Sequence, residues 1–445
     1  MIPPSQGTVG HFPGYDSRIM CIFVYFLIIY VPISAGQNVI IPKKPKRTKM
    51  DTIQQVLDEK RLVIHFQPIL SVRGRTFFGL EALVRGVEKD GSMIPPDRLF
   101  REAAEAGLNV ELDRLARHMA IESFYPFWKK NKRLLLFVNF ESGLIDTFEP
   151  GRYLFDGLLS RFGIPFSNIV LEIKEDKIRD TGKLQAFCTH YRNLGFNIAL
   201  DDFGIGQSSF DRLSIVRPDI IKIDRSLISG IDTDYIHQEI VQAICRMSTN
   251  IGAIALAEGI ETIAEAGYAQ HLGATLIQGF WIAKPTAMPI SCGFREHISR
   301  LKSYHQKLHL EQYLHDEELR NQAESLCERF IQNVAQENGI AEWDRRIKPI
   351  IASESNIEAL YLINASARQI GPTLLQRKTR SFFEPMKDGC DHSRKEYYSR
   401  TIDSMNQSHL TNNYVSLATG NLCCTYARKI EIDQDPYVLC IDFIR

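Results

Sequence analysis

The sequence predicts a TIM-like (β/α)₈ barrel followed by a small α+β domain. From about residue 50 to residue 300, apolar strand-like runs alternate with amphipathic helical patterns. Eight such strands within about 250 residues match the size and rhythm of this barrel. Nearly all of them carry a polar residue at or near the carboxyl end, and in a parallel barrel those ends share one face. Periodicity alone leaves a doubly wound open sheet as the alternative.

The predicted elements of the barrel are short apolar runs and three-and-four-spaced helical patterns. The strands are expected at Leu62–Phe66, Phe77–Val84, Leu134–Asn139, Ile169–Ile173, Asn197–Asp201, Ile220–Ile223, Ile254–Ala257 and Thr275–Ile277. Helices are expected after most of them, for example at Leu112–Phe127, Leu184–Leu194, Tyr235–Ser248 and Glu261–His271.

Composition narrows the class of protein. A chain of 445 residues can hold two or three domains, and 44% apolar with 24% charged residues is ordinary for a soluble protein. The formal charge is zero, so no global field favours a DNA or RNA duplex as a partner. Nine cysteines without a CxxC pair indicate a reduced, cytoplasmic interior rather than a disulfide framework or a zinc site.

The first 49 residues are predicted to be a leader or a marginal membrane segment. Residues 19–33 carry no charge, but they are fewer than the roughly 20 residues that a spanning helix needs. The basic residues between 43 and 49 would keep the rest of the chain on the cytoplasmic side. The alternatives are an anchor at the inner face of the membrane and a non-structural leader upstream of Met50.

The pattern changes after the barrel, which is assigned to residues 50–300. A charged helix over Leu301–Val334 forms most of a linker at 301–338, and its apolar residues Leu319, Ala323, Leu326, Phe330 and Val334 form a stripe. That stripe suits pairing with a partner helix or packing against its own domain. Shorter alternating runs from Ile350 onward predict a small antiparallel sheet with helices, in a domain spanning 339–445.

Acidic and amide residues would converge at the mouth of the barrel. The set comprises Glu81, Asn139, Glu172, Asp201, Asp202 and Glu258. Two unit charges about 4 Å apart repel by about 4 kcal/mol at an effective dielectric of 20, so five carboxylates need cations. Oxygen donors favour Mg²⁺ or Mn²⁺, and the lack of His and Cys at these strand ends argues against zinc. The number of carboxylates suits a two-metal site for phosphoryl chemistry, in which Lys222 would orient water or neutralise developing charge.

Asp201 and Asp202 are adjacent, although neighbouring side chains of a strand point to opposite faces. A solvated turn is one explanation, since Asp and Gly are common turn residues. The other is that the strand ends between them, so that Asp202 already lies in a turn and both carboxylates face one site.

Seven ordered motifs carry a resemblance to a known family. They are EALVR at Glu81–Arg85, VN at Val138–Asn139, LEIKE at Leu171–Glu175, DDFGIG at Asp201–Gly206, KID at Lys222–Asp224, AEGIET at Ala257–Thr262 and QGFWIAKP at Gln278–Pro285. Over about Gln54 to His297 the chain resembles the EAL-domain phosphodiesterases, which hydrolyse cyclic di-GMP to linear pGpG. The resemblance implies a barrel in which one strand runs against the others, and a homodimer formed through barrel surfaces and the Leu319–Val334 helix.

The resemblance also implies roles for individual residues. Glu81, Asn139, Glu172, Asp201 and Glu258 match metal ligands, and Asp202 matches the carboxylate shared between two Mg²⁺ or Mn²⁺ ions. Lys222 matches an essential lysine near the attacking water, and Gln278 a polar catalytic and substrate-binding residue across from it. Arg85 matches a phosphate-binding arginine, Glu175 a glutamate that holds the loop after Asp202, and Glu261 a further acidic residue near the site.

The departures from the family pattern leave every expected metal ligand in place. Gly86 stands where a large aromatic residue is common, Ile205 where a threonine is common, and Phe140–Glu141 replaces a commoner Leu-Ser pair. These departures put the rate of turnover in question more than the type of reaction. The rival interpretations are a receptor that binds cyclic di-GMP without turnover, a metal-dependent barrel acting on sugar phosphates, and a purely structural barrel.

The tail, with its segments at 388–398 and 414–427, resembles PAS/Cache-like sensor modules that follow some EAL domains. This resemblance implies a small-molecule signal of unknown identity. The alternative is a dimerisation module that binds no ligand.

Overall fold

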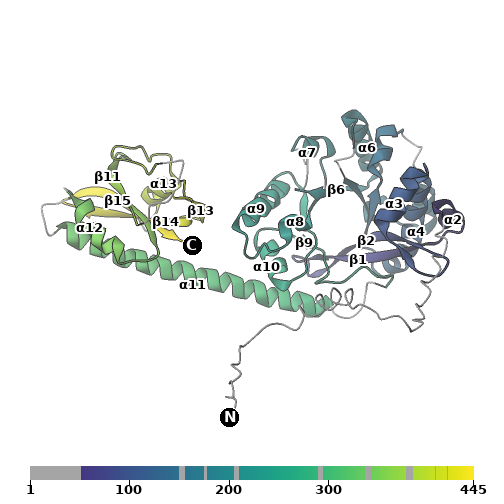
Figure 1. Cartoon of the computed structure of the whole chain (residues 1–445), viewed down its shortest axis with the longest axis horizontal. Coiled ribbons are helices and arrows are strands. Elements are labelled where there is room, and N and C mark those ends of the chain that lie inside the picture. Colours follow the sequence, from purple (N-terminus) through teal and green to yellow (C-terminus); the bar gives the residue numbers. More distant parts are fainter. Residues whose placement is uncertain are drawn as a thin grey trace, which may run out of the picture. The chain divides into compact units, whose positions relative to one another are not determined.

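The computed structural model describes residues 52–149, 156–174, 178–204, 210–288, 294–335, 340, 342–376, 384–405, 407–417 and 419–445. In these ranges the chain forms a barrel surrounded by helices and a separate β-rich domain, and a long helix is continuous with both (Figure 1). The predicted leader or membrane segment at residues 1–49, with its uncharged stretch at 19–33, lies outside the described residues. None of the described helices has the length and apolar character needed to cross a membrane.

Eight strands close the barrel, as the sequence predicts. They are β1 (Leu62–Ser71), β2 (Thr76–Val87), β4 (Leu135–Phe140), β5 (Ile169–Lys174), β6 (Asn197–Phe203), β7 (Ile220–Ile223), β8 (Ile254–Ala257) and β9 (Leu276–Ile277). Neighbouring strands from β2 through β4 to β9 are parallel, whereas β1 is antiparallel to both β2 and β9 and joins them. This closure rules out the open sheet, and β1 is the one strand of reversed direction. The short β3 (Met93–Ile94) extends β2 on the outside.

One apolar layer inside the barrel sets the position of the polar residues. Its buried members are Ile69, Phe137, Val170, Ala199, Ile220, Leu256 and Leu276. Because residues two apart on a strand share a face, the next inward residues along β4 to β9 are Asn139, Glu172, Asp201, Lys222, Glu258 and Gln278. On β2 the same step leads from Gly79 to Glu81. A Cβ on Gly79 would lie 2.5 Å from the Phe137 ring, so only glycine leaves room for that ring in the layer.

Helices cover the outside of the barrel. They are α2 (Ile53–Asp58), α3 (Pro96–Glu105), α4 (Asn109–Lys130), α5 (Asp156–Phe162), α6 (Thr181–Leu194), α7 (Phe210–Val216), α8 (Arg225–Ile228), α9 (Tyr235–Asn250) and α10 (Ile263–His271), with 3₁₀ turns at Ser142–Thr147 and Phe166–Asn168. Several begin at local capping signals. Asp180 accepts a hydrogen bond from the Lys183 amide, and Thr262 with Glu265 forms a capping box.

The C-terminal domain is an antiparallel sheet with helices packed on it. Its strands are β10 (Ile357–Asn364), β11 (Gln369–Leu375), β12 (Ser408–Leu410), β13 (Tyr414–Val415), β14 (Leu422–Ile432) and β15 (Asp435–Ile444). Their order is β11-β10-β15-β14-β12, and β13 also pairs with β14. The helices are α12 (Trp343–Ala352), α13 (Glu396–Asp403) and the end of α11 (Phe294–Ala335). The predicted small α+β domain is therefore present, while its PAS/Cache-like character stays a prediction.

The apolar stripe of the linker helix packs against its own domain. Leu319, Ala323, Leu326, Phe330 and Val334 are all at most 5% exposed and share a core with Trp343, β10, β14 and β15. The expectation that this stripe pairs with a partner helix is wrong, because its side chains are already covered by the C-terminal sheet. The first part of α11 packs instead against α10 of the barrel.

Candidate active site

Lys222 lies at the centre of the polar cluster in the barrel mouth. Its Nζ is 2.6 Å from Glu172, 2.8 Å from Asp201 and 2.8 Å from Glu258, and 3.9 Å from Glu81. The lysine side chain is 2% exposed. β7 carries this ammonium group and four other strands or strand ends bring the carboxylates to it, which is the convergence that the sequence predicts.

An amide group lies on the other side of Glu81. The Gln278 side chain donates to Glu81 Oε2 at 2.5 Å and to Gln67 Oε1 at 3.2 Å, and Asn139 donates to Glu81 Oε1 at 3.4 Å. Gln67 in turn donates to the Ala283 carbonyl at 3.2 Å. The mouth of the barrel thus holds carboxylates, amides and one buried ammonium group in a continuous network.

A bulge in β6 explains how two adjacent aspartates face one site. The pairing of β6 with β7 shifts register between Leu200 and Phe203, and Asp202 has a left-handed φ of 55°. Asp is among the residues that tolerate this conformation best. Asp201 ends the regular part of the strand and contacts Lys222, while Asp202 turns toward Lys174. Both predicted carboxylates therefore reach the mouth, and their oxygens lie within 4.8 Å of a Glu258 oxygen.

Lys174 is a site residue that the sequence interpretation did not single out. It follows Glu172 by two residues on β5, so it shares the inward face. Its Nζ is 2.5 Å from Asp202 and 3.6 Å from Asp201. The LEIKE motif contains it, and the two-residue step from Glu172 was the signal that could have identified it. Gln67 was missed as well: it directly follows the predicted strand Leu62–Phe66, but β1 runs in the opposite direction to its neighbours, continues to Ser71 and carries Gln67 in its interior.

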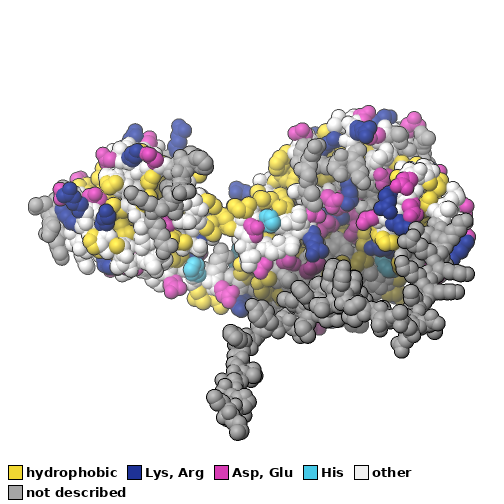
Figure 2. Space-filling view, viewed as in Figure 1, with side chains coloured by type: hydrophobic (Ala, Val, Ile, Leu, Met, Phe, Trp, Pro, Cys, Tyr) yellow, Lys and Arg dark blue, Asp and Glu magenta, His cyan; other side chains and the backbone are white. Residues whose placement is uncertain are grey.

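Burial and charge shift the proton affinities of the cluster in opposite directions. Burial raises the pKa of Glu258 to about 8 and that of Glu172 well above its ordinary range. Burial also raises the pKa of Asp201, but the ammonium groups of Lys222 and Lys174 outweigh it, and the net pKa is lowered. Burial lowers the pKa of Lys222, but Asp201 and the neighbouring glutamates raise it by more. The net pKa is well above the ordinary value for lysine, so the group is charged. Figure 2 shows acidic and basic side chains on the surface of both the barrel part and the C-terminal part of the molecule.

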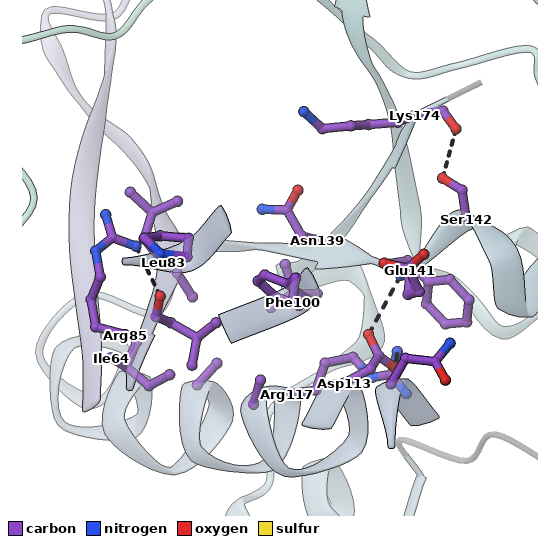
Figure 3. A pocket seen from close by; sticks show the side chains of 18 of the residues that line it. Ile64, Leu83, Arg85, Phe100, Asp113, Arg117, Asn139, Glu141, Ser142 and Lys174 are labelled. Carbon is purple, nitrogen blue, oxygen red and sulfur yellow. Dashed lines mark hydrogen bonds and ion pairs between the residues drawn. The ribbon is translucent and has the colours of Figure 1, made fainter. Parts of the chain in front are cut away.

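A cavity of about 630 Å³ adjoins the cluster. Arg85, Asn139 and Lys174 extend from β2, β4 and β5 toward its open side, and Phe100 forms part of an apolar wall (Figure 3). Arg85 is half-buried and donates to the Val84 carbonyl at 2.9 Å. Burial lowers its pKa, which the nearby Glu81 carboxylate partly offsets. Arg85 therefore places a half-buried guanidinium group at the cavity, close enough to Glu81 for their charges to interact.

One of the predicted site residues that the structure describes is not joined to the cluster. Glu261 lies beyond β8 with its side chain 42% exposed, and it forms an ion pair of 2.9 Å with Arg225. Glu175 lies outside the described residues, as does Ile205. Gly86 is described, and a Cβ there would lie 3.0 Å from Ile94 and Leu99, so these side chains fill the space of the aromatic residue common in the family.

The donor set fits hard divalent cations. It consists of carboxylate and amide oxygens, and two buried oxygens, Glu172 Oε2 and Gln278 Oε1, have no hydrogen-bond partner among the described residues. Lysine ammonium groups contact the carboxylates where a cation would be expected to bind. The fold and the site together define a class of protein: a TIM-type barrel whose mouth holds acidic oxygen donors next to a cavity lined by arginine and lysine side chains.

Comparison with known proteins identifies the family. The family model described as "EAL domain" matches residues 50–285, so the chain belongs to the EAL domain family. It is 28% identical over 232 residues to the probable cyclic di-GMP phosphodiesterase PdeB of Escherichia coli K12, covering 52% of this chain and 44% of PdeB. It is 29% identical over 246 residues to the cyclic di-GMP phosphodiesterase PdeF of the same strain, covering 54% of this chain and 32% of PdeF. The matched region thus spans less than half of these relatives.

A solved structure shares the fold over most of the chain. It is the YkuI protein of Bacillus subtilis, which has an EAL domain and was crystallised with its substrate cyclic di-GMP and calcium. The TM-score is 0.74 at 20% identity, over 89% of this chain and 99% of YkuI. This likeness shows a common fold that extends beyond the barrel.

Proposed function

We propose that this chain hydrolyses cyclic di-GMP to linear pGpG with two divalent cations, Mg²⁺ or Mn²⁺. The observation that carries the proposal is the complete cluster of Glu81, Glu172, Asp201 and Glu258 around Lys222, joined by Asp202. PdeF, a relative with the same domain, is a cyclic di-GMP phosphodiesterase.

Five carboxylates and Asn139 would hold the two cations, and Asp202 would lie between them. When bound, such a pair supplies Lewis-acid stabilisation of the transferring phosphoryl group and acidifies water. Lys174 and Lys222 neutralise the carboxylates before the cations arrive, which keeps the cluster folded.

The chain's own residues would position the substrate. The Arg85 guanidinium can grip a phosphate oxygen with two N–H groups, and the adjoining cavity has apolar walls for a base. Lys222 would direct its ammonium protons at the developing negative charge, and the Gln278 amide lies across the mouth from it. We propose that Glu175 holds the loop after Asp202 in place. Glu261, near the site, is proposed to help keep the loops ordered.

Incubation of the full chain with cyclic di-GMP tests the proposal. We expect pGpG to form with Mg²⁺ or Mn²⁺ and formation to stop when a chelator is added. Binding of cyclic di-GMP without any pGpG would show the rival function, a receptor. All the carboxylates and Lys222 are present, and this completeness favours turnover over the receptor.

We further propose that the C-terminal domain regulates turnover. A cavity of about 310 Å³ in this domain is lined by Tyr361, His392, Tyr397, Tyr414 and Asp442, among others, and is large enough for a small organic ligand. The buried residues Leu319 to Val334 belong to this domain's core, so a truncation test must end before Leu319 rather than at residue 338. A change in turnover on truncation supports regulation, and an unchanged rate argues for a module without influence on the barrel.

We also propose that the chain acts as a homodimer. With Leu319–Val334 buried, the helix can offer only the segment before it, where Leu310, Tyr313 and Leu314 are 56–61% exposed at three-and-four spacing. Light scattering coupled to gel filtration tests this: Leu310→Ser with Leu314→Ser is expected to give a monomer, and a dimer of the double variant would place the contact elsewhere.

A further inference from the structure

Three histidines meet where the long helix α11 packs against the barrel. His271 is the last residue of α10, and His305 and His309 lie one turn apart on α11. The ring centroids of His305 and His309 are 4.4 Å apart, and those of His271 and His309 are 5.1 Å apart. One ring nitrogen from each histidine lies within 4.8 Å of the other two.

The helices are held close at this point by a specific contact. A Cβ on Gly267 of α10 would lie 2.3 Å from the Tyr304 ring of α11, so the absence of a side chain lets the two helices approach. Tyr304 is adjacent to His305, and Gly267 is one turn before His271. The fold thus fixes two of the three imidazoles, while His309 is exposed and can rotate.

The surroundings of the three histidines leave a ring nitrogen available to bind a metal ion. His271 Nδ1 is buried and has no hydrogen-bond partner among the described residues. Neutral imidazole nitrogens are good ligands for Zn²⁺, Co²⁺, Ni²⁺ and Cu²⁺, whereas Mg²⁺ prefers oxygen. A tetrahedral Zn²⁺ with bonds of about 2.0–2.1 Å needs nitrogens roughly 3.4 Å apart. Rotation of the exposed His309 side chain can supply the remaining approach.

We propose that His271, His305 and His309 form a transition-metal site, with Zn²⁺ as the representative ion, that clasps α11 to α10. Water completes the coordination, since three imidazoles leave one tetrahedral position open. Residues 309–315 are exposed in α11, so the metal binds at the point where the helix leaves the barrel surface. The site differs in chemistry from the oxygen-rich mouth of the barrel and does not depend on the proposed activity.

The test uses the full chain without any histidine tag, in saturating Mg²⁺ to occupy the barrel mouth. Zn²⁺ binding is measured by titration calorimetry, and Co²⁺ binding by the visible absorption of a tetrahedral complex. We expect one tight Zn²⁺ per chain and a higher melting temperature when it is bound. His309→Gln, on an exposed side chain, is expected to weaken binding by roughly 100-fold or more, since loss of outer-shell groups alone costs about 10–100-fold.

Two matched variants make the result specific. His315→Gln changes an exposed histidine farther along the same helix and should bind Zn²⁺ as the native chain does. Asp202→Asn alters the barrel mouth and should leave Zn²⁺ binding intact. Equal Zn²⁺ affinity in His309→Gln and the native chain would overturn the proposal, and so would a loss of Zn²⁺ confined to Asp202→Asn.

Discussion

Two buried acidic sites in this chain are satisfied in different ways. In the barrel mouth, the carboxylates of Glu172, Asp201 and Glu258 are held by the ammonium group of Lys222 at 2.6–2.8 Å. In the C-terminal domain, Asp442 accepts hydrogen bonds from the hydroxyls of Thr425 at 2.7 Å and Tyr361 at 3.4 Å. Among the described residues no ion pair involves Asp442. The carboxylates of the barrel mouth are thus paired with an ammonium group, whereas Asp442 accepts hydrogen bonds from neutral hydroxyls.

This difference indicates whether each site can take up metal ions or protons. In the barrel mouth the ammonium groups of Lys222 and Lys174 lower the pKa of Asp201, while burial raises the pKa of Glu258 to about 8, so cations and protons compete for these carboxylates. Asp442 is bound by neutral hydroxyls instead, and burial raises its pKa to about 7. We therefore expect the barrel mouth to respond to divalent cations as well as to protons, and the C-terminal cavity to respond to protons.

Removal of Lys222 should have the largest effect. Lys222→Ala is expected to lower turnover at least 100-fold, because the group facing the developing charge is lost. Without divalent cations it should also destabilise the fold by about 3–5 kcal/mol, since Glu172, Asp201 and Glu258 lose their nearest ammonium group. Mg²⁺ should restore part of that stability. Initial rates and urea unfolding with and without Mg²⁺ measure both effects.

Lys129→Ala, an exposed change on α4, serves as the control and should leave rate and stability unchanged. A Lys222→Ala variant with near-native turnover would show that the reacting phosphodiester lies elsewhere.

The two adjacent aspartates should separate catalysis from stability. Asp202→Asn is expected to reduce turnover about 100-fold or more with little change in stability, because its side chain is 39% exposed. Asp201→Asn should reduce both, because the buried Asp201 carboxylate is 2.8 Å from Lys222. Rates and melting temperatures of the two variants are compared side by side. Equal melting temperatures would contradict the assignment of Asp201 to the buried network.

Most of the barrel and its mouth could be predicted from sequence. The alternation of strands and helices along the chain and the two-residue repeat of inward side chains within each strand lead to the same assignment. Each inward apolar residue, such as Val170 or Ile220, is followed two positions later by a polar one, and this pattern needs no knowledge of neighbours. The adjacency of Asp201 and Asp202 likewise indicated a break in the strand, but β6 continues to Phe203, so the break is a bulge and not the predicted strand end. The reversed direction of β1 could be expected only from the family resemblance.

Other features depend on contacts between distant segments. Lys174 gained its place through the turn of Asp202 on the neighbouring strand, and Gln67 through the amide of Gln278, 211 residues away. The stripe from Leu319 to Val334 was compatible with two partners, and only the C-terminal sheet decides between them. A sequence pattern specifies an apolar face, but not the surface that covers it.

A glycine beside Gln278 supports the far wall of the mouth, so its replacement should have an intermediate effect. A Cβ on Gly279 would lie 2.1 Å from the Ile260 carbonyl oxygen, a backbone atom that cannot move aside cheaply. Gly279→Ala is expected to cost about 3 kcal/mol and to lower turnover, because the Ile260 amide bonds to the Gln278 carbonyl at 3.0 Å. Gly157→Ala, in an exposed position of α5 with free space around it, should be neutral or slightly stabilising. Equal stability of the two variants would contradict this close contact.

The last effect is expected at Asp442, and it concerns protons rather than turnover. In the unfolded chain an aspartate has a pKa of about 4, so between about pH 4 and pH 7 the folded chain binds a proton that the unfolded chain has released. Stability due to this group is therefore full below about pH 4 and falls as the pH rises to about 7, by roughly 1 kcal/mol per pH unit. Asp442→Asn should flatten that slope, whereas Asp433→Asn in the exposed β14–β15 turn should retain it. Urea unfolding from pH 4 to pH 8, followed at Trp343 in the core of this domain, measures the slope. An unchanged slope in Asp442→Asn would mean that the carboxylate is charged when folded, and the contrast with the barrel mouth would be lost.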